Sequence, residues 1–175
     1  MADLSEFVAG NISDYNENEL CFDTISVKKV VWLSILTFGI YEIIWFYKCW
    51  KTLAVKFGHK VSPFWRAIFA GITGFWLFPT ISRYVEKFEM ETFDGIFFAI
   101  LYLLIGWSYR LPDPLSLLGF ASVVIIALAQ DKINKVNAQY FPNAPVNKWS
   151  GINTSWAILG GIMLFFVLVG MFITD

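Results

Sequence analysis

The chain has 175 residues, of which 57% are hydrophobic and 15% are charged, and its formal net charge is −1. A soluble domain carries about 45–50% apolar and about 25% charged residues, so this composition argues against a soluble domain and predicts a membrane protein. The net charge gives no basic excess of the kind that nucleic-acid-binding proteins show, and nucleic acid is not expected as a partner.

The N-terminal region is acidic. Residues 1–24 contain Asp and Glu but no Lys or Arg, the reverse of the basic start of a signal peptide. No apolar run begins before Val30. We therefore expect residues 1–27 to form a disordered tail and residues 28–175 to form one helical membrane domain.

Five apolar segments approach the length of about 20 residues that a helix needs to cross a bilayer. Lipid-exposed backbone groups must be satisfied within a segment, which excludes open sheets. The sequence therefore predicts an all-α integral membrane protein, a bundle of four or five transmembrane helices. The segments are residues 30–47, 63–81, 94–111, 114–129 and 156–173.

The sequence leaves two questions open: whether the first segment crosses the membrane, and which way the chain is oriented in it. A bend at Gly39 would let the first segment enter the membrane and return instead of crossing it. Lys and Arg are almost evenly divided between the two sides, so the positive-inside rule does not orient the chain.

The links between segments also carry patterns. The short link after residue 111 predicts an antiparallel hairpin of the third and fourth segments. In residues 48–62, Trp50, Leu53 and Ala54 recur at helical spacing, and lysines stand between them. This pattern predicts an amphipathic helix on the membrane surface. The helical period of the fourth segment continues past residue 129, and we expect this helix to end within residues 137–145.

Glu42 lies inside the first apolar segment. An acid at the centre of a membrane helix costs about 2.5–3.5 kcal/mol on insertion scales and usually has a partner. No basic residue lies three or four positions away, so an ion-pair partner must come from another segment. Arg66, one turn into the second segment, is the predicted partner. The alternatives are a shallow, hydrated Glu42 with Arg66 reaching the headgroups, or a transport or proton-relay role.

Further polar residues recur around Glu42. Ser34, Thr37, Tyr41 and Trp45 recur at helical spacing, which predicts one polar helix face that packs inward or lines a wet crevice. Asn134 and Asn137 lie one turn apart, and capping or solvent exposure is expected to explain them better than a binding site.

Signatures of enzymes and cofactors are missing from the sequence. It contains no nucleophile elbow, HExxH, P-loop or dinucleotide fingerprint. Cys21 and Cys49 match no metal or redox spacing. We expect no enzyme activity, no cofactor and no metal.

The run ISVKKVVWLSILTFGIYEIIWFYKCWKTL resembles a family of small bacterial multi-pass membrane proteins of unknown function. Its recurring pattern, Thr-x-Gly-x-Tyr-x-x-x-Trp-x-Tyr-Lys, is matched here in the first apolar segment, and SPFWRAIF and INKVNAQYFP are similar to further family segments. The resemblance implies a bacterial inner-membrane location and brings no substrate or catalytic residue. The matching residues are Thr37, Gly39, Tyr41, Trp45, Tyr47 and Lys48.

Three functions are compatible with these observations. The leading expectation is a non-enzymatic membrane component that acts through protein partners or self-association, with membrane lipids around it. The main alternative is a small oligomeric channel or transporter with the first helix lining the path. A membrane enzyme that acts on lipids comes third.

Overall fold

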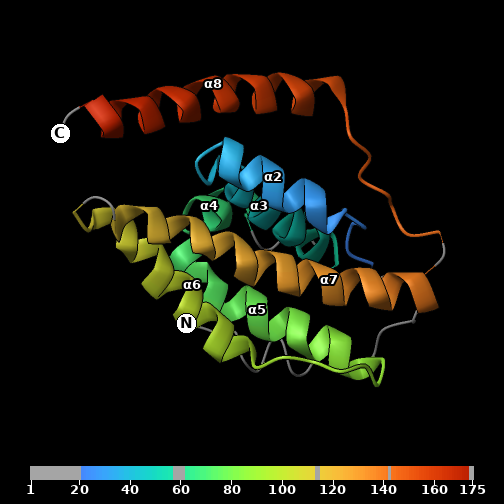
Figure 1. The fold of residues 1–175 in the computed structure, drawn as a ribbon. Coiled ribbons are helices and arrows are strands. Elements are labelled where there is room, and N and C mark those ends of the chain that lie inside the picture. The colour runs from blue at the N-terminus through green and yellow to red at the C-terminus, as the bar shows by residue number, and fades with distance from the viewer. Residues whose placement is uncertain (1–20, 57–61, 113–114, 142, 174–175) are drawn as a thin grey trace.

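The computed structural model describes residues 21–56, 62–112, 115–141 and 143–173, which are helical apart from the connecting turns and one isolated bridge between Thr24 and Val146. The all-α prediction is confirmed. Helix α7 (Ser122–Tyr140) runs through the middle of the fold, with α2 (Val27–Leu36) on one side and α5 (Ala70–Lys87) and α6 (Gly95–Trp107) on the other (Figure 1). Of the tail expected over residues 1–27, residues 1–20 lie outside the described residues.

The first apolar segment is two helices, α2 and α3 (Ile40–Lys56), and the single helix predicted over residues 30–47 is wrong. Helix α2 ends in a Schellman arrangement, in which Gly39 N–H donates to Ser34 O at 2.8 Å and Phe38 N–H donates to Ile35 O at 3.2 Å. Phe38 and Gly39 have φ values of 51° and 84°. Glycine adopts such a φ without steric penalty, whereas a side chain makes it unfavourable, so Gly39 permits the turn.

Thr37 joins the two helices. Its hydroxyl donates to Leu33 O at 2.5 Å in the last turn of α2 and accepts the N–H of Tyr41 at 3.0 Å in the first turn of α3. One side chain therefore serves the end of one helix and the start of the next. The Thr-x-Gly-x-Tyr pattern is the sequence of this turn, which is the bend at Gly39 that the sequence left open.

Helix α3 continues to Lys56, so the surface helix predicted over residues 48–62 is not a separate element. Trp50, Leu53 and Ala54 are 3%, 1% and 2% exposed. The apolar side of this pattern packs into the protein core, whereas the prediction placed it against the membrane surface.

The second apolar segment is also divided, into α4 (Pro63–Ile68) and α5, with the break at Phe69. The third is α6, whose first turn is capped by Asp94 through bonds from the N–H groups of Ile96 and Phe97. A 3₁₀ turn, η1 (Ser108–Arg110), extends it, and the chain then reverses toward η2 (Leu115–Ala121) and α7. Helices α6 and α7 pack on each other, as the hairpin prediction requires.

The fourth helix ends within the predicted range, and the fifth begins earlier than predicted. Helix α7 runs to Tyr140, which confirms that the fourth helix continues past residue 129. Helix α8 (Gly151–Ile173) begins before residue 156. Among the helical stretches whose side chains are all described, one, Leu115–Tyr140, is both long and apolar enough to cross a membrane, and 44% of its most apolar part is buried inside the fold. Several side chains of α8 lie outside the described ones. The helices α2 and α6 have 10 and 13 residues, below the usual spanning range of about 17–25 residues, and α3 with 17 residues is at its lower end.

An aromatic core holds α3, α5 and α6 together. Trp45, Phe46 and Phe78 are fully buried, and the rings of Phe46 and Phe78 meet edge to face with centroids 5.8 Å apart. Tyr102 of α6 joins this cluster, with its ring centroid 5.3 Å from that of Phe46. The core thereby fixes the position of Tyr102, whose hydroxyl reaches the site described below.

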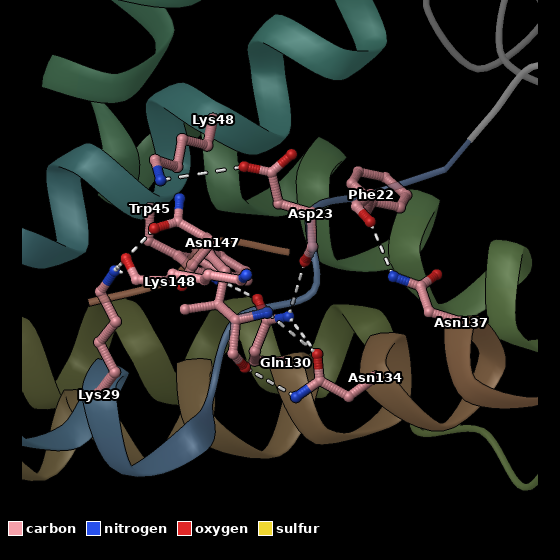
Figure 2. Close-up of polar contacts among 11 residues, drawn as sticks. Phe22, Asp23, Lys29, Trp45, Lys48, Gln130, Asn134, Asn137, Asn147 and Lys148 are labelled. Atoms are coloured by element: carbon pink, nitrogen blue, oxygen red, sulfur yellow. Dashed lines mark hydrogen bonds and ion pairs between the residues drawn. The ribbon is translucent and has the colours of Figure 1, made fainter. Parts of the chain in front are cut away.

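Three amide side chains on α7 bind the chain segment 21–26 (Figure 2). Asn134 accepts the N–H of Ile25 at 3.2 Å and donates to Ile25 O at 2.7 Å, so it pairs with both backbone groups of that residue. Gln130, 1% exposed, donates to Asp23 O and accepts the indole N–H of Trp45 at 2.7 Å. Backbone bonds from Thr24 to the segment around Val146 cover the other side.

The third amide, Asn137, is 2% exposed, donates to Phe22 O and accepts the hydroxyl of Tyr84 at 3.2 Å. The expectation that Asn134 and Asn137 are caps or solvent-exposed is therefore wrong, because both bind the segment 21–26. Phe22 and Ile25 are 2% and 1% exposed and belong to the core. The domain therefore includes residues 21–27, and the predicted boundary at residue 28 is too late.

We predict that Asn134→Ala lowers the free energy of unfolding in detergent by about 1–3 kcal/mol, because it leaves buried backbone groups of Ile25 unpaired. Hydrogen exchange of the Ile25 amide should accelerate. Gln139→Ala, at an exposed position of the same helix, is the matched control and should change neither quantity. Unchanged exchange at Ile25 in Asn134→Ala would contradict this role of the amide.

Candidate functional site

Glu42 is the centre of the candidate site. It lies in the first turn of α3, where a carboxylate complements the helix dipole, and it is 5% exposed. The Tyr102 hydroxyl of α6 donates to Oε2 of Glu42 at 2.9 Å. The Ser122 hydroxyl at the start of α7 lies 2.8 Å from Oε1. Three helices that are distant in sequence therefore meet at one buried carboxyl group.

Ser122 lets this site hold Glu42 in either protonation state. Its hydroxyl has one hydrogen but two acceptors, Oε1 of Glu42 at 2.8 Å and Gly119 O at 2.9 Å. With an ionised Glu42, Ser122 donates to the carboxylate. With a protonated Glu42, the carboxyl group donates to Ser122, and Ser122 donates to Gly119 O. When Glu42 gains or loses a proton, rotation of the Ser122 hydroxyl group therefore keeps the site hydrogen-bonded.

A cavity of about 550 Å³ reaches this carboxyl group. Glu42, Tyr102 and Ser122 form its polar wall, and its apolar wall includes Ile68 and Trp107. A cavity of this size, mostly apolar with a few convergent polar groups, has the general character of a small-ligand site. The described arrangement can bind a proton or a small group that donates hydrogen bonds to Glu42.

The predicted pair of Glu42 and Arg66 is not formed. The guanidinium of Arg66 lies over the ring of Trp50, 4.4 Å from its centroid. Trp50 follows Glu42 by eight residues on α3, about 12 Å along the helix axis. The prediction failed because α3 runs on past Trp50 to Lys56, and Arg66 meets α3 at Trp50, about two turns beyond Glu42. Ion pairs among the described residues join other side chains: Lys48–Asp23, Lys132–Glu91 and Lys135–Asp131.

The predicted polar helix face is divided by the turn at residues 37–39. Ser34 lies on α2, Thr37 in the turn, and Tyr41 and Trp45 on α3, so they do not share one continuous helix face. All four are buried, at 2%, 7%, 4% and 0% exposure. The expectation that they pack inward is correct. None of them is among the described lining residues of the Glu42 cavity.

Two of these residues keep unpaired polar atoms. The hydroxyl groups of Ser34 and Tyr41 are buried and have no hydrogen-bond partner among the described residues. Thr37 and Trp45 use their polar atoms in the turn and in the bond to Gln130. The four residues are thus parts of the fold's interior, whereas Glu42 lines the cavity.

The sequence interpretation missed Tyr102 and Ser122. Each is a single polar side chain within an apolar run, FFAILYLLIGW for Tyr102 and GFASVVII for Ser122. A search for polar residues at these depths could have found both as candidate partners. Arg110, which closes the apolar segment of α6, also lines the cavity, although its own side chain is exposed.

The described residues contain no group of three or more His, Cys, Asp or Glu side chains that could hold a metal ion. Both cysteines are free thiols in the structure, and Cys49 is buried. The ionisable and hydroxyl groups that line the cavity are those of Glu42, Tyr102, Ser122 and Arg110.

Comparisons of the chain with protein-family models, with curated proteins and with solved structures gave no match. The resemblance to the bacterial membrane family thus stays a prediction from the Thr-x-Gly-x-Tyr-x-x-x-Trp-x-Tyr-Lys pattern.

We predict that Glu42→Leu lowers the free energy of unfolding in detergent by about 1–3 kcal/mol, because it removes the carboxyl group that accepts the Tyr102 hydroxyl and leaves Ser122 with Gly119 O as its acceptor. Glu42→Gln should cost clearly less, since the amide can accept from Tyr102 and donate to Ser122. Glu86→Leu, at an exposed position of α5, is the control and should change stability by no more than about 0.5 kcal/mol. Equal losses in Glu42→Leu and Glu42→Gln would contradict the hydrogen-bond arrangement.

Proposed function

We propose that the chain is a multi-pass integral membrane protein of four or five membrane helices, located in a bacterial inner membrane, and that it is a non-enzymatic component acting through protein partners or self-association. The observation that carries this proposal is the exposed apolar surface of helix α8. Its substantial contacts with the rest of the fold are made with α2, and large apolar side chains remain exposed along it (Figure 1). They are Trp156, Ile158, Leu159, Ile162, Met163, Phe165 and Phe166.

The composition of α8 supports a membrane position. Residues 156–173 contain no charged side chain, and a helix of 23 residues is about 34 Å long, enough to cross a hydrocarbon core of about 30 Å. Exposed apolar side chains on the other helices, such as Phe97 and Leu104 of α6 and Val124 of α7, give the bundle a surface suited to lipid.

The contact between α8 and α2 is close but narrow. A Cβ atom at Gly160 would overlap the carbonyl oxygen of Leu36, whereas one at the next residue, Gly161, would meet the Leu36 side chain at an ordinary 3.8 Å. Small residues allow such close helix approach in membranes. Because this seam uses one side of α8, the other sides are available to a second protein or a second copy.

The alternative, a small oligomeric channel or transporter, is favoured by one observation, the cavity that ends at Glu42. The predicted path along the first helix has less support, because Ser34, Thr37 and Tyr41 do not line that cavity in the described residues. A packed core that keeps those residues buried suits a protein-interaction role better than conduction along that face.

We predict that the full chain stays in the membrane pellet when membranes of the expressing bacterium are extracted with alkaline carbonate. A photo-crosslinking residue in place of Met163, exposed on α8, should form adducts with protein, either a second copy or another membrane protein identified by mass. The same residue in place of Ala129, fully buried in α7, is the control and should form none.

Release of the chain by carbonate would contradict the membrane location. Adducts only with lipid at Met163 would leave the location intact and contradict action through a protein contact of α8. The two parts of the proposal therefore fail separately.

A further inference from the structure

A second cavity, of about 610 Å³, lies at the N-terminal end of α2, away from the Glu42 site. Its walls come from α2, from α7 at Asn134 and Ala138, and from the link 146–149 that leads to α8. Figure 2 shows Lys29, Asn147 and Lys148 of this region beside the amide side chains of α7. Neither the Glu42 chemistry nor the contact of α8 with α2 makes use of this cavity.

The cavity is positively charged. Lys28, Lys29 and Lys148 line it, and its described lining contains no Asp or Glu. None of these three lysines takes part in the ion pairs found in the described part of the chain. Lysines gathered in a hollow without acidic neighbours raise the local concentration of anions.

Lys29 is the buried member of this group, with 5% exposure. Its ammonium donates to Asn147 Oδ1 at 2.6 Å, to Lys148 O at 2.8 Å and to Asn147 O at 3.3 Å. All three acceptors are neutral. A buried charge of this kind is costly unless an opposite charge lies close by, and an anion in the cavity would supply one.

Lys29 also builds the cavity. Its bonds to residues 147 and 148 hold the link before α8 against the first turn of α2, which brings Lys148 and Lys28 into one lining. Both of these side chains are exposed and therefore accessible to a ligand. Ser26, at the N-terminus of α2, also lines the cavity and makes no side-chain cap to the helix, so the positive end of the helix dipole lies at this end of the cavity.

Two tryptophans in the lining indicate the source of the anion. Trp32 and Trp149 are 60% and 49% exposed. Exposed indoles together with lysines are typical of the level of lipid headgroups, where the ring meets apolar chains and its polar edge meets water. Basic pockets at this level bind anionic headgroups.

We propose that this cavity binds a phosphate-bearing anion, the headgroup phosphate of an anionic phospholipid, with Lys28 and Lys148 contacting the phosphate and Lys29 holding the wall behind them. The proposal shares with the proposed function only the membrane location and needs no protein partner.

The test compares the purified full chain in nanodiscs of phosphatidylcholine alone and of phosphatidylcholine mixed with phosphatidylglycerol. The measured quantity is the thermal unfolding midpoint. The variant K28Q/K148Q removes the two exposed lysines and keeps Lys29. The control R83Q/K87Q removes two exposed charges on α5, on the other side of α7, so both variants lose the same net charge. Inorganic phosphate added to the phosphatidylcholine discs is a separate arm.

We expect phosphatidylglycerol to raise the midpoint of the wild type and of R83Q/K87Q, and this shift to be lost in K28Q/K148Q. Both variants should match the wild type in phosphatidylcholine alone, because the replaced side chains are exposed. An equal shift in K28Q/K148Q and R83Q/K87Q would overturn the site. A full shift with inorganic phosphate, without a further gain from phosphatidylglycerol, would overturn the assignment to a lipid.

Discussion

The turn at Thr37, Phe38 and Gly39 is the constraint on which the rest of the fold depends. It divides an apolar run long enough for one helix into α2 and α3, with Thr37 bonded to both and two consecutive residues at positive φ. Because of this turn, α2 can lie between α7 and α8 while α3 packs into the aromatic core. The Glu42 cavity lies directly beside this turn and is lined by Phe38 and Gly39, whereas the second cavity lies at the other end of α2.

Helix α7 provides the polar partners that the interior needs. Ser122 meets Glu42 at one end, and Gln130, Asn134 and Asn137 bind the segment 21–26 toward the other. Burying polar groups is favourable only when they are hydrogen-bonded, and a helix offers partners at regular spacing along one face. These buried partners explain why α7 carries amide side chains among the apolar residues of its buried face.

The sequence predicted the helical class, the approximate place of each apolar segment and the continuation of the fourth helix, because these follow from hydrophobicity and its helical period. It did not predict the partner of Glu42. The prediction of Arg66 assumed that the first helix ends soon after Glu42, so that the start of the second segment lies at the same depth. Helix α3 instead extends to Lys56, and Arg66 meets it at Trp50. Tyr102 and Ser122 are distant in sequence, and only the packing of α6 and α7 brings them to α3. The sequence does not predict the roles of Asn134 and Asn137, because they bind backbone groups of Ile25 and Phe22 more than 100 residues away, and such partners leave no pattern in the sequence.

The most direct test of the account is a pair of double-mutant cycles on the free energy of unfolding in detergent. One cycle combines Glu42→Leu with Tyr102→Phe, and the other combines Glu42→Leu with Arg66→Met. The account predicts a coupling of about 0.5–3 kcal/mol for Glu42 with Tyr102, and additivity within about 0.5 kcal/mol for Glu42 with Arg66. Coupling to Arg66 together with additivity at Tyr102 would contradict it, because Glu42 would then face α4 instead of α6.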